Sequence, residues 1–113
     1  MLCKSSSKRS MDLHRLQVDL LRSAIRLVKP GGIVVYSTCT YAPEENELVI
    51  EKVLDLARLE RISIPGLAAC PGITGWSGKD LNRELCKTAR YYPHLNDTGG
   101  FYVARLVKKQ EHL

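Results

Sequence analysis

A short run rich in β-branched residues, Ile33–Ser37, limits the folds open to this chain more than any other feature. Pro30, Gly31 and Gly32 precede the run, and the segment Thr38–Ala42 follows it as an expected turn. This length and composition between two turns is typical of a strand buried on both faces. We therefore expect a sheet with helices packed against it, which is an α/β fold.

The rest of the chain predicts helices and strands in alternation. We expect a helix over 12–29, a helix over 43–58 that Pro43 opens, a strand over 61–64, a short helix over 79–87 and a strand over 100–108. The apolar residues of the first helix recur at helical spacing, and we expect this face to be buried: Leu13, Leu16, Leu20, Leu21, Ala24, Leu27 and Val28. A basic stripe occupies the other side of that helix: Arg15, Arg22, Arg26 and Lys29. Three strands are too few for a doubly wound domain, and no Gly-x-Gly-x-x-Gly turn precedes any of these helices.

The length of 113 residues allows one small domain with a modest core. We expect a flexible basic start over 1–11, a partial domain over 12–109 and a tail over 110–113. No apolar run could span a bilayer or act as a secretory signal, so we expect no membrane contact. The four cysteines form no Cys-x-x-Cys pair and have no histidine at zinc-site spacing, so we expect no metal and a cytoplasmic chain with free thiols.

The positive charge is concentrated at the N-terminal end. Residues 1–29 hold seven basic side chains against two acidic ones, whereas residues 30–113 hold ten of each sign. The whole net charge of +5 therefore belongs to the first quarter of the chain. This asymmetry favours a polyanion such as RNA as the partner of the first helix, and a solvated basic surface is the alternative.

Cys39 is the residue best placed for chemistry. It follows the predicted buried strand and comes just before the N-terminus of the helix that Pro43 opens. In open α/β sheets ligands bind beyond the carboxyl ends of the strands, and a helix N-terminus favours the thiolate form of a nearby cysteine. Cys39 is therefore a candidate nucleophile, although most free cysteines are small, inert core residues.

The two segments around Cys39, Lys29–Thr40 and Pro43–Glu47, resemble the Nop/Sun-type RNA 5-methylcytosine methyltransferases. The similarity extends to 90–94 and 99–106, which are similar to the closing motif and last strand of that family. The resemblance implies the C-terminal portion of a Rossmann-like class I methyltransferase sheet. In it the 33–37 and 61–64 strands run parallel, with the last strand inserted between them and antiparallel to both.

The resemblance also implies a reaction. It matches Cys39 to the catalytic cysteine of the family's Thr-Cys motif, and so implies that Cys39 adds covalently to C6 of a cytosine in transfer or ribosomal RNA. The methyl donor implied is S-adenosylmethionine. The family's glycine-rich cofactor turn and its Asp-Ala-Pro-Cys motif have no counterpart in this chain, so we assign no cofactor-binding residue. We expect a fragment or subunit that lacks the cofactor-binding half and is inactive alone.

A fragment of this kind leaves the 33–37 strand with an unpaired edge and partly uncovered faces. We therefore expect a complementing N-terminal half or self-association. Two other hypotheses stay open. In the first alternative, the chain is a non-catalytic RNA-binding remnant that uses its basic helix. In the second, it is the structural remnant of a broken reading frame.

Weaker candidates surround the site. Arg90 and His94 are RNA-binding candidates from the closing motif, and a lone surface histidine is the alternative for His94. Asn46 either orients the loop around Cys39 or pairs only with local backbone groups. Trp76 either stacks on a base or caps an apolar cluster. Gly99 and Gly100 are expected to form a turn.

Overall fold

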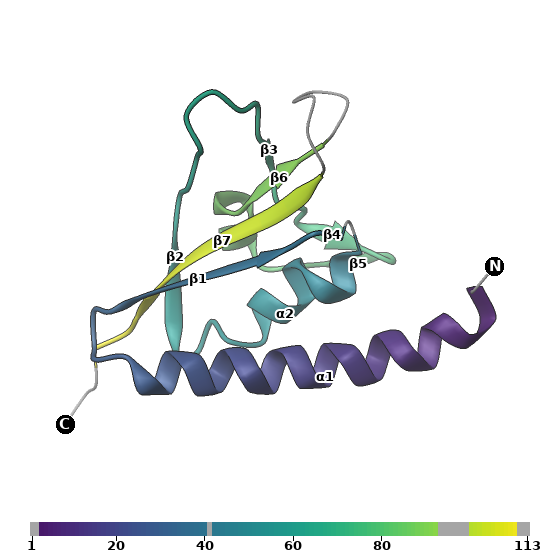
Figure 1. Cartoon of the computed structure of the whole chain (residues 1–113), viewed down its shortest axis with the longest axis horizontal. Coiled ribbons are helices and arrows are strands. Elements are labelled where there is room, and N and C mark those ends of the chain that lie inside the picture. The colour runs from purple at the N-terminus through teal and green to yellow at the C-terminus, as the bar shows by residue number, and fades with distance from the viewer. Residues whose placement is uncertain (1–2, 41, 93–99, 111–113) are drawn as a thin grey trace.

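The computed structural model describes residues 3–40, 42–92 and 100–110, with residues 3–10 described by their backbone alone. One long helix, α1, runs along one side of the molecule, below α2 and a twisted sheet (Figure 1). The elements in chain order are α1 (Cys3–Leu27), β1 (Ile33–Thr38), the 3-10 helix η1 (Pro43–Glu45), α2 (Glu47–Glu51), β2 (Ala57–Glu60), β3 (Cys70–Pro71), β4 (Gly75–Trp76), β5 (Lys79–Asp80), the 3-10 helix η2 (Arg83–Lys87), β6 (Ala89–Tyr91) and β7 (Phe101–Lys108).

The last strand, β7, organises the sheet. It pairs antiparallel with β1 along its length, from Ile33 opposite Val107 to Thr38 opposite Tyr102. On its other side it pairs antiparallel with β2 and then with β6, which in turn pairs with β3. Strands β1 and β2 are both antiparallel to β7 and hence parallel to each other. The predicted insertion of the last strand between two parallel strands is therefore confirmed.

The predicted number and bounds of the other strands are wrong. The sheet has five strands rather than three, and β4 and β5 form a separate two-stranded hairpin. The second parallel strand is β2, Ala57–Glu60, rather than 61–64. Within β2, Ala57 and Leu59 are buried while Arg58 is exposed, so a strand's period of two prevails over the helical pattern read there. The helix expected over 43–58 is shortened accordingly to η1, α2 and a run of turns.

Two helix boundaries also differ from the prediction. Helix α1 begins at Cys3 rather than near Asp12, because residues 3–11 contain no proline or glycine that would stop a helix. The short helix expected over 79–87 starts instead as strand β5 and becomes helical only from Arg83, with the Asn82 side chain accepting a hydrogen bond from Glu84 N–H.

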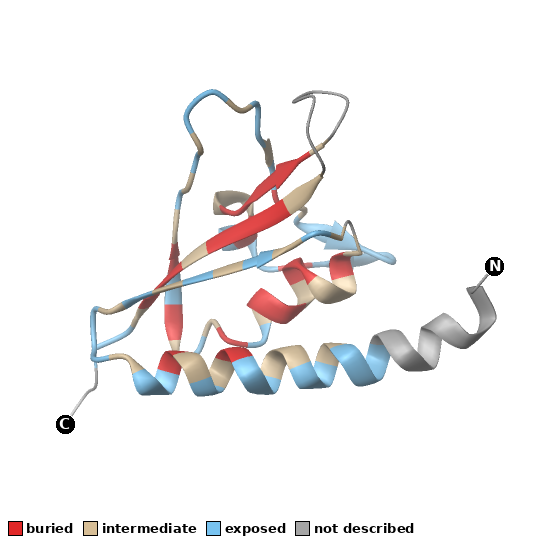
Figure 2. Cartoon of the chain, viewed as in Figure 1, coloured by how far each residue is buried: buried red, intermediate tan, exposed pale blue. Residues whose placement is uncertain are grey.

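The main core lies between the helices and one face of the sheet (Figure 2). Leu21 and Ile25 of α1 pack there against Ile50 of α2 and Leu106 of β7. A smaller cluster around Tyr91 and Val103 packs on residues of the 62–67 segment. Burying side chains of this size stabilises a fold by about 1.5–3 kcal/mol each.

The face of α1 that packs on the core matches the predicted one only in part, because Leu21 is buried as expected whereas the buried Ile25 lies outside the predicted set. The buried positions are Leu21 and Ile25, with Val18 partly buried beside them. The predicted leucine face is largely exposed, with Leu20 at 61% and Leu27 at 87%. Residues two positions apart point about 200° apart around a helix, so Leu20 lies opposite Arg22, which contacts the segment after α2. The leucine face therefore points away from α2.

Strand β1 is exposed on one face as well. Its side chains alternate, with Val34 and Tyr36 against the core and Val35 58% exposed on the other face. Burial on both faces, as predicted from composition, is therefore wrong for this chain. Within the described residues β1 pairs with β7 alone, so the predicted unpaired edge and uncovered face are confirmed. None of the helices in the described ranges is long and apolar enough to cross a membrane.

Candidate active site

Cys39 stands immediately after β1, at the carboxyl end of that strand. Its residue is exposed, and its thiol is free. The neighbouring Thr38 is the last residue of β1 paired to β7, opposite Tyr102. The sheet therefore fixes the backbone up to the residue before the thiol and leaves the thiol itself accessible, as its predicted role requires.

Asn46 bridges the two residues that flank Cys39. Its side chain is fully buried, with Oδ1 accepting a hydrogen bond of 2.5 Å from the Thr38 hydroxyl and Nδ2 donating one of 2.9 Å to the Thr40 carbonyl. A buried amide is costly unless both of its ends are paired, and here both are. The sequence left two roles open for Asn46, pairing with local backbone groups and orienting the loop around Cys39. The contact with the Thr40 carbonyl is a local backbone pairing, and together with the Thr38 contact it holds the turn that carries Cys39.

A second contact anchors the helix that follows. The Tyr36 hydroxyl on β1 donates a hydrogen bond of 2.7 Å to the Glu45 carbonyl at the end of η1. Burial, with a smaller contribution from the charge of Glu45, raises the pKa of Tyr36 to about 12. The phenol therefore stays protonated at neutral pH, as a donor must, and η1 is tied to the strand that carries Cys39.

Beneath this turn lies a buried ion pair, Glu47 with Arg90. The guanidinium donates from Nε and from a terminal nitrogen to the two carboxylate oxygens, both at 2.6 Å, and Glu47 also accepts a hydrogen bond from the Ile73 N–H. Burial alone would lower the pKa of Arg90, but the hydrogen bonds and charge of Glu47 outweigh it and raise the pKa. The pair links α2 to β6 and fixes the start of α2.

This burial corrects one predicted site residue. Arg90 was expected to face the RNA, but it is only 4% exposed and its guanidinium is committed to Glu47. Its place in the closing motif therefore serves the packing beneath the site. His94 and Gly99 lie outside the described residues.

The basic stripe on α1 divides into two kinds of residue. Arg15, Arg26 and Lys29 are exposed. Arg22 instead makes two hydrogen bonds to the Asp55 carboxylate, at 2.8 and 3.0 Å, and one to the Lys52 carbonyl. The hydrogen bonds from Arg22 lower the pKa of Asp55, so this pair is ionised at neutral pH. Of the four predicted RNA contacts on α1, Arg22 is thus the one held within the fold.

Sequence reasoning missed Glu47 and Tyr36 as parts of the site. Glu47 lies inside the motif, but its partner is far along the chain, and no local pattern connects an acidic residue with a distant arginine. Within the described residues no group of three or more His, Cys, Asp and Glu side chains could hold a metal ion.

Comparison with known proteins identifies the family. The model of the 16S rRNA methyltransferase RsmB/F family matches residues 3–107, which is nearly the whole chain. The chain belongs to the RsmB/F methyltransferase family. The Nop/Sun-type resemblance read from the Cys39 motif is thereby confirmed.

Relatives of this RsmB/F family member are RNA methyltransferases by name. The chain is 42% identical over 96 residues to the tRNA (cytosine(49)-C(5))-methyltransferase of Pyrococcus abyssi, covering 83% of this chain and 30% of that protein. It is 39% identical over 110 residues to the 25S rRNA (cytosine-C(5))-methyltransferase nop2 of Schizosaccharomyces pombe, covering 92% of this chain and 18% of that protein.

Solved structures agree with the fold. A methyltransferase homolog protein from Pyrococcus horikoshii aligns with a TM-score of 0.77 and 36% identity over 91% of this chain and 33% of the other. NSun6 from Pyrococcus horikoshii, solved with SFG, aligns with a TM-score of 0.68 and 35% identity over 87% of this chain and 23% of the other. The predicted fold, part of a Rossmann-like methyltransferase sheet, is confirmed, and the chain spans a third or less of these relatives.

Proposed function

We propose that this chain supplies the nucleophile of an enzyme that methylates C5 of cytosine in transfer or ribosomal RNA in the cytoplasm. The observation that carries the proposal is the exposed Cys39 at the carboxyl end of β1, in a turn held on both sides by Asn46. Relatives named as RNA cytosine-C5 methyltransferases support the choice of base and of RNA.

The chemistry needs a nucleophile because C5 of cytosine is too electron-poor to take up a methyl group unaided. The Cys39 thiolate forms a bond to C6, and the electron pair of the C5–C6 double bond moves so that C5 becomes enamine-like. After C5 has been methylated, the C5 proton leaves, the double bond re-forms and the thiolate is expelled from C6. A base in structured RNA must leave its stack to reach the thiol.

The methyl donor implied by the family is S-adenosylmethionine, and we propose that its site lies mainly outside the described residues. The turn from β1 into η1, Cys39–Ala42, contains no glycine, and no described strand leads through a glycine-rich turn into a helix. This supports the proposal that the residues that hold the donor come from elsewhere, and we derive no step from this chain's contact with it.

We propose that they come from a complementing half, an α/β unit that docks beside β1. The free edge of β1 faces away from β7, and the exposed leucine face of α1 points away from α2. A unit that adds a parallel strand to that edge and a helix beside Leu16, Leu20 and Leu27 covers both surfaces at once. The chain covers only 30% of its Pyrococcus abyssi relative, so that relative contains a larger portion that could supply such a unit.

A covalent trap tests the nucleophile directly. The chain is combined with the N-terminal portion of a relative and incubated with S-adenosylmethionine and RNA that contains 5-fluorocytidine. Fluorine at C5 is not lost as a proton is, so the adduct persists and appears as a slower band on a denaturing gel. We expect the band with the natural chain and with Cys86→Ser, and no band and no 5-methylcytosine with Cys39→Ser. An adduct that survives Cys39→Ser would refute the assignment.

The exposed Arg15, Arg26 and Lys29 support the second candidate, a non-catalytic RNA-binding remnant. It predicts RNA binding that weakens with salt, is lost on reversing the charges of Arg15 and Arg26, and is unchanged in Cys39→Ser. Methyl transfer by the complemented chain that depends on Cys39 would exclude this candidate.

A further inference from the structure

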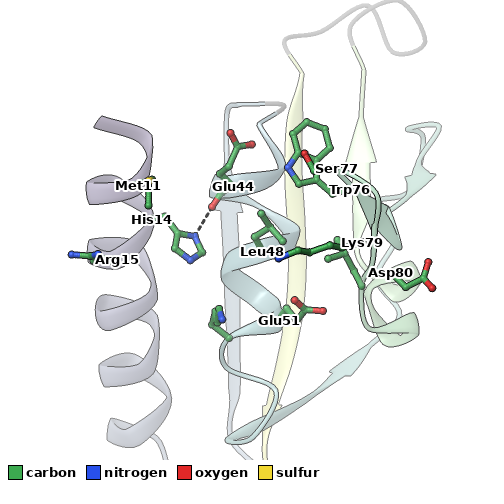
Figure 3. A pocket seen from close by; sticks show the side chains of 12 residues that line it. Met11, His14, Arg15, Glu44, Leu48, Glu51, Trp76, Ser77, Lys79 and Asp80 are labelled. Atoms are coloured by element: carbon green, nitrogen blue, oxygen red, sulfur yellow. Dashed lines mark hydrogen bonds between the residues drawn. The ribbon is translucent and has the colours of Figure 1, made fainter. Parts of the chain in front are cut away.

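A pocket of about 540 Å³ lies between α1, α2 and the β4–β5 hairpin, and the proposed methyl transfer does not use it (Figure 3). Met11 and His14 line it from α1, Leu48 from α2, and Trp76 and Lys79 from the hairpin. Its volume is within the range of small-molecule sites, and Cys39 is not among its lining residues.

The hairpin presents an aromatic ring to this pocket. Trp76, the single tryptophan of the chain, is 40% exposed and pairs across the hairpin with Lys79. The two turn residues, Ser77 and Gly78, both have positive φ, at 52° and 76°. Two such residues make the tight turn that matches the twist of a hairpin, so the indole and the lysine are held side by side.

The opposite wall carries a histidine whose ring is held by a backbone carbonyl. His14 Nδ1 lies 2.8 Å from the Glu44 carbonyl, and because a carbonyl can only accept, Nδ1 carries the proton. Nε2 of the neutral ring is then an acceptor. Figure 3 shows the Lys79 side chain reaching over Leu48 toward His14, whereas the Asp80 carboxylate points away from the pocket.

We propose that this pocket binds one unpaired ribonucleotide of the RNA, with its base on Trp76 and its phosphate at Lys79 and Lys52. Proteins bind single strands by stacking bases on aromatic rings beside cationic groups. This pocket supplies both, although Glu44 and Glu51 also line it, so the phosphate is placed at the two lysines rather than across the whole pocket. His14 Nε2 is placed to accept a hydrogen bond from an exocyclic amine or a 2′-hydroxyl. The inference rests on the proposed function in that RNA is the partner.

The single tryptophan provides the test. Titration of the full chain with a single-stranded hexacytidylate should quench its fluorescence to saturation, because Trp76 is the only indole. With a labelled oligonucleotide, anisotropy should show the dissociation constant rising by about fivefold or more in Trp76→Leu, and by less in Trp76→Phe. Lys79→Glu should weaken binding more than Arg83→Glu, a matched charge reversal at an exposed residue of η2 outside the pocket. Circular dichroism of each variant confirms that it folds.

Two results separate this inference from the proposed function. If Cys39→Ser abolishes methyl transfer by the complemented chain while RNA leaves the fluorescence of Trp76 unchanged, the pocket inference is wrong and the enzyme assignment stands. If RNA quenches Trp76 in the natural chain and in Cys39→Ser but no Cys39-dependent methyl transfer occurs, the pocket stands and the assignment fails. Quenching by the complementing half alone, with none by RNA, would show that a protein segment fills the pocket.

Discussion

Asn46 spans Cys39 with one side chain, so a single amide holds both flanks of the proposed nucleophile. Its two partners are the Thr38 hydroxyl, on the last residue of β1, and the Thr40 carbonyl, two residues beyond the strand. The turn is thus built so that the thiol projects while its neighbours are held.

Replacing Asn46 by alanine tests this clamp. Asn46→Ala leaves the Thr40 carbonyl and Thr38 hydroxyl short of a partner, so we expect a loss of about 1–3 kcal/mol in the free energy of unfolding. We also expect a lower rate of adduct formation per folded molecule in the complemented chain. Urea denaturation and the trapping gel measure these two effects. Asn82→Ala, which removes the exposed η2 cap, is the control and should leave adduct formation unchanged.

The buried pair of Glu47 and Arg90 predicts a stability effect. Arg90→Ala leaves the Glu47 carboxylate buried without its partner, and we expect a loss of about 3–5 kcal/mol in the free energy of unfolding. The double variant Glu47→Leu with Arg90→Met removes both charges and should lose less than Arg90→Ala. Urea denaturation of the natural chain, Arg90→Ala and the double variant measures these differences in the free energy of unfolding. An Arg90→Ala protein of unchanged stability but weakened RNA binding would restore Arg90 as an RNA contact.

Tyr36 predicts a dependence of stability on alkaline pH. Its pKa is raised to about 12 in the folded chain, from an ordinary value of 10.0. The contribution of the protonated Tyr36 phenol to the free energy of unfolding is therefore complete below pH 10 and is lost as the pH rises from 10 toward 12. Tyr36→Phe should remove this contribution to the change of the free energy of unfolding with pH. The difference between the natural chain and Tyr36→Phe separates Tyr36 from the other groups that titrate in this pH range. Equal slopes in denaturation curves over that range would contradict the expectation.

At the scale of elements, α1 presents two apolar faces with different roles. Ile25 on the buried face is fully inaccessible, whereas Leu20 on the other face is mostly exposed. The basic residues Arg15 and Arg26 lie outside both faces, and Arg22 binds Asp55 in the segment after α2. The helix is therefore fixed to its own chain by one face and left with an unpartnered apolar face.

The two faces should respond differently to substitution. Ile25→Ala removes buried methylene groups and should cost about 2–5 kcal/mol in the free energy of unfolding. The paired change of Leu16 and Leu20 to lysine should leave unfolding nearly unchanged, because both are exposed, yet it should abolish complementation by the N-terminal half. Adduct formation that persists with both lysines would show that the leucine face is not the docking surface.

At the scale of the whole molecule, the described chain is a sheet open at β1. The edge of β1 carries unpaired backbone groups, and its outer face exposes Ile33 and Val35. An exposed edge of this kind is a template for another strand, whether from a complementing half or from a second copy.

We therefore expect the isolated chain to self-associate when no complementing half is present. Light scattering after size exclusion should give a mass above that of one chain, falling toward one chain when Val35 is replaced by lysine. Addition of the complementing half should replace the self-association by a one-to-one complex. A stable monomer of the natural chain at all concentrations would contradict the open-edge argument.

The sequence by itself determined the strand at Ile33, the break at Pro30 and the turn with Cys39, because these rest on local composition, whereas the insertion of the last strand between two parallel strands followed only from the family resemblance. The sequence misplaced the second strand. Residues 57–60 continue the helical spacing of the segment before them, but their backbone pairs with β7 and forms a strand. Only the tertiary structure decided that Arg90 is buried on Glu47, that Asn46 bridges the residues around Cys39, and that Leu16, Leu20 and Leu27 of α1 face outward. The physical reason is the same in each case. A local pattern states that a side chain is apolar or charged, but which surface or partner it meets depends on contacts between segments far apart in the chain.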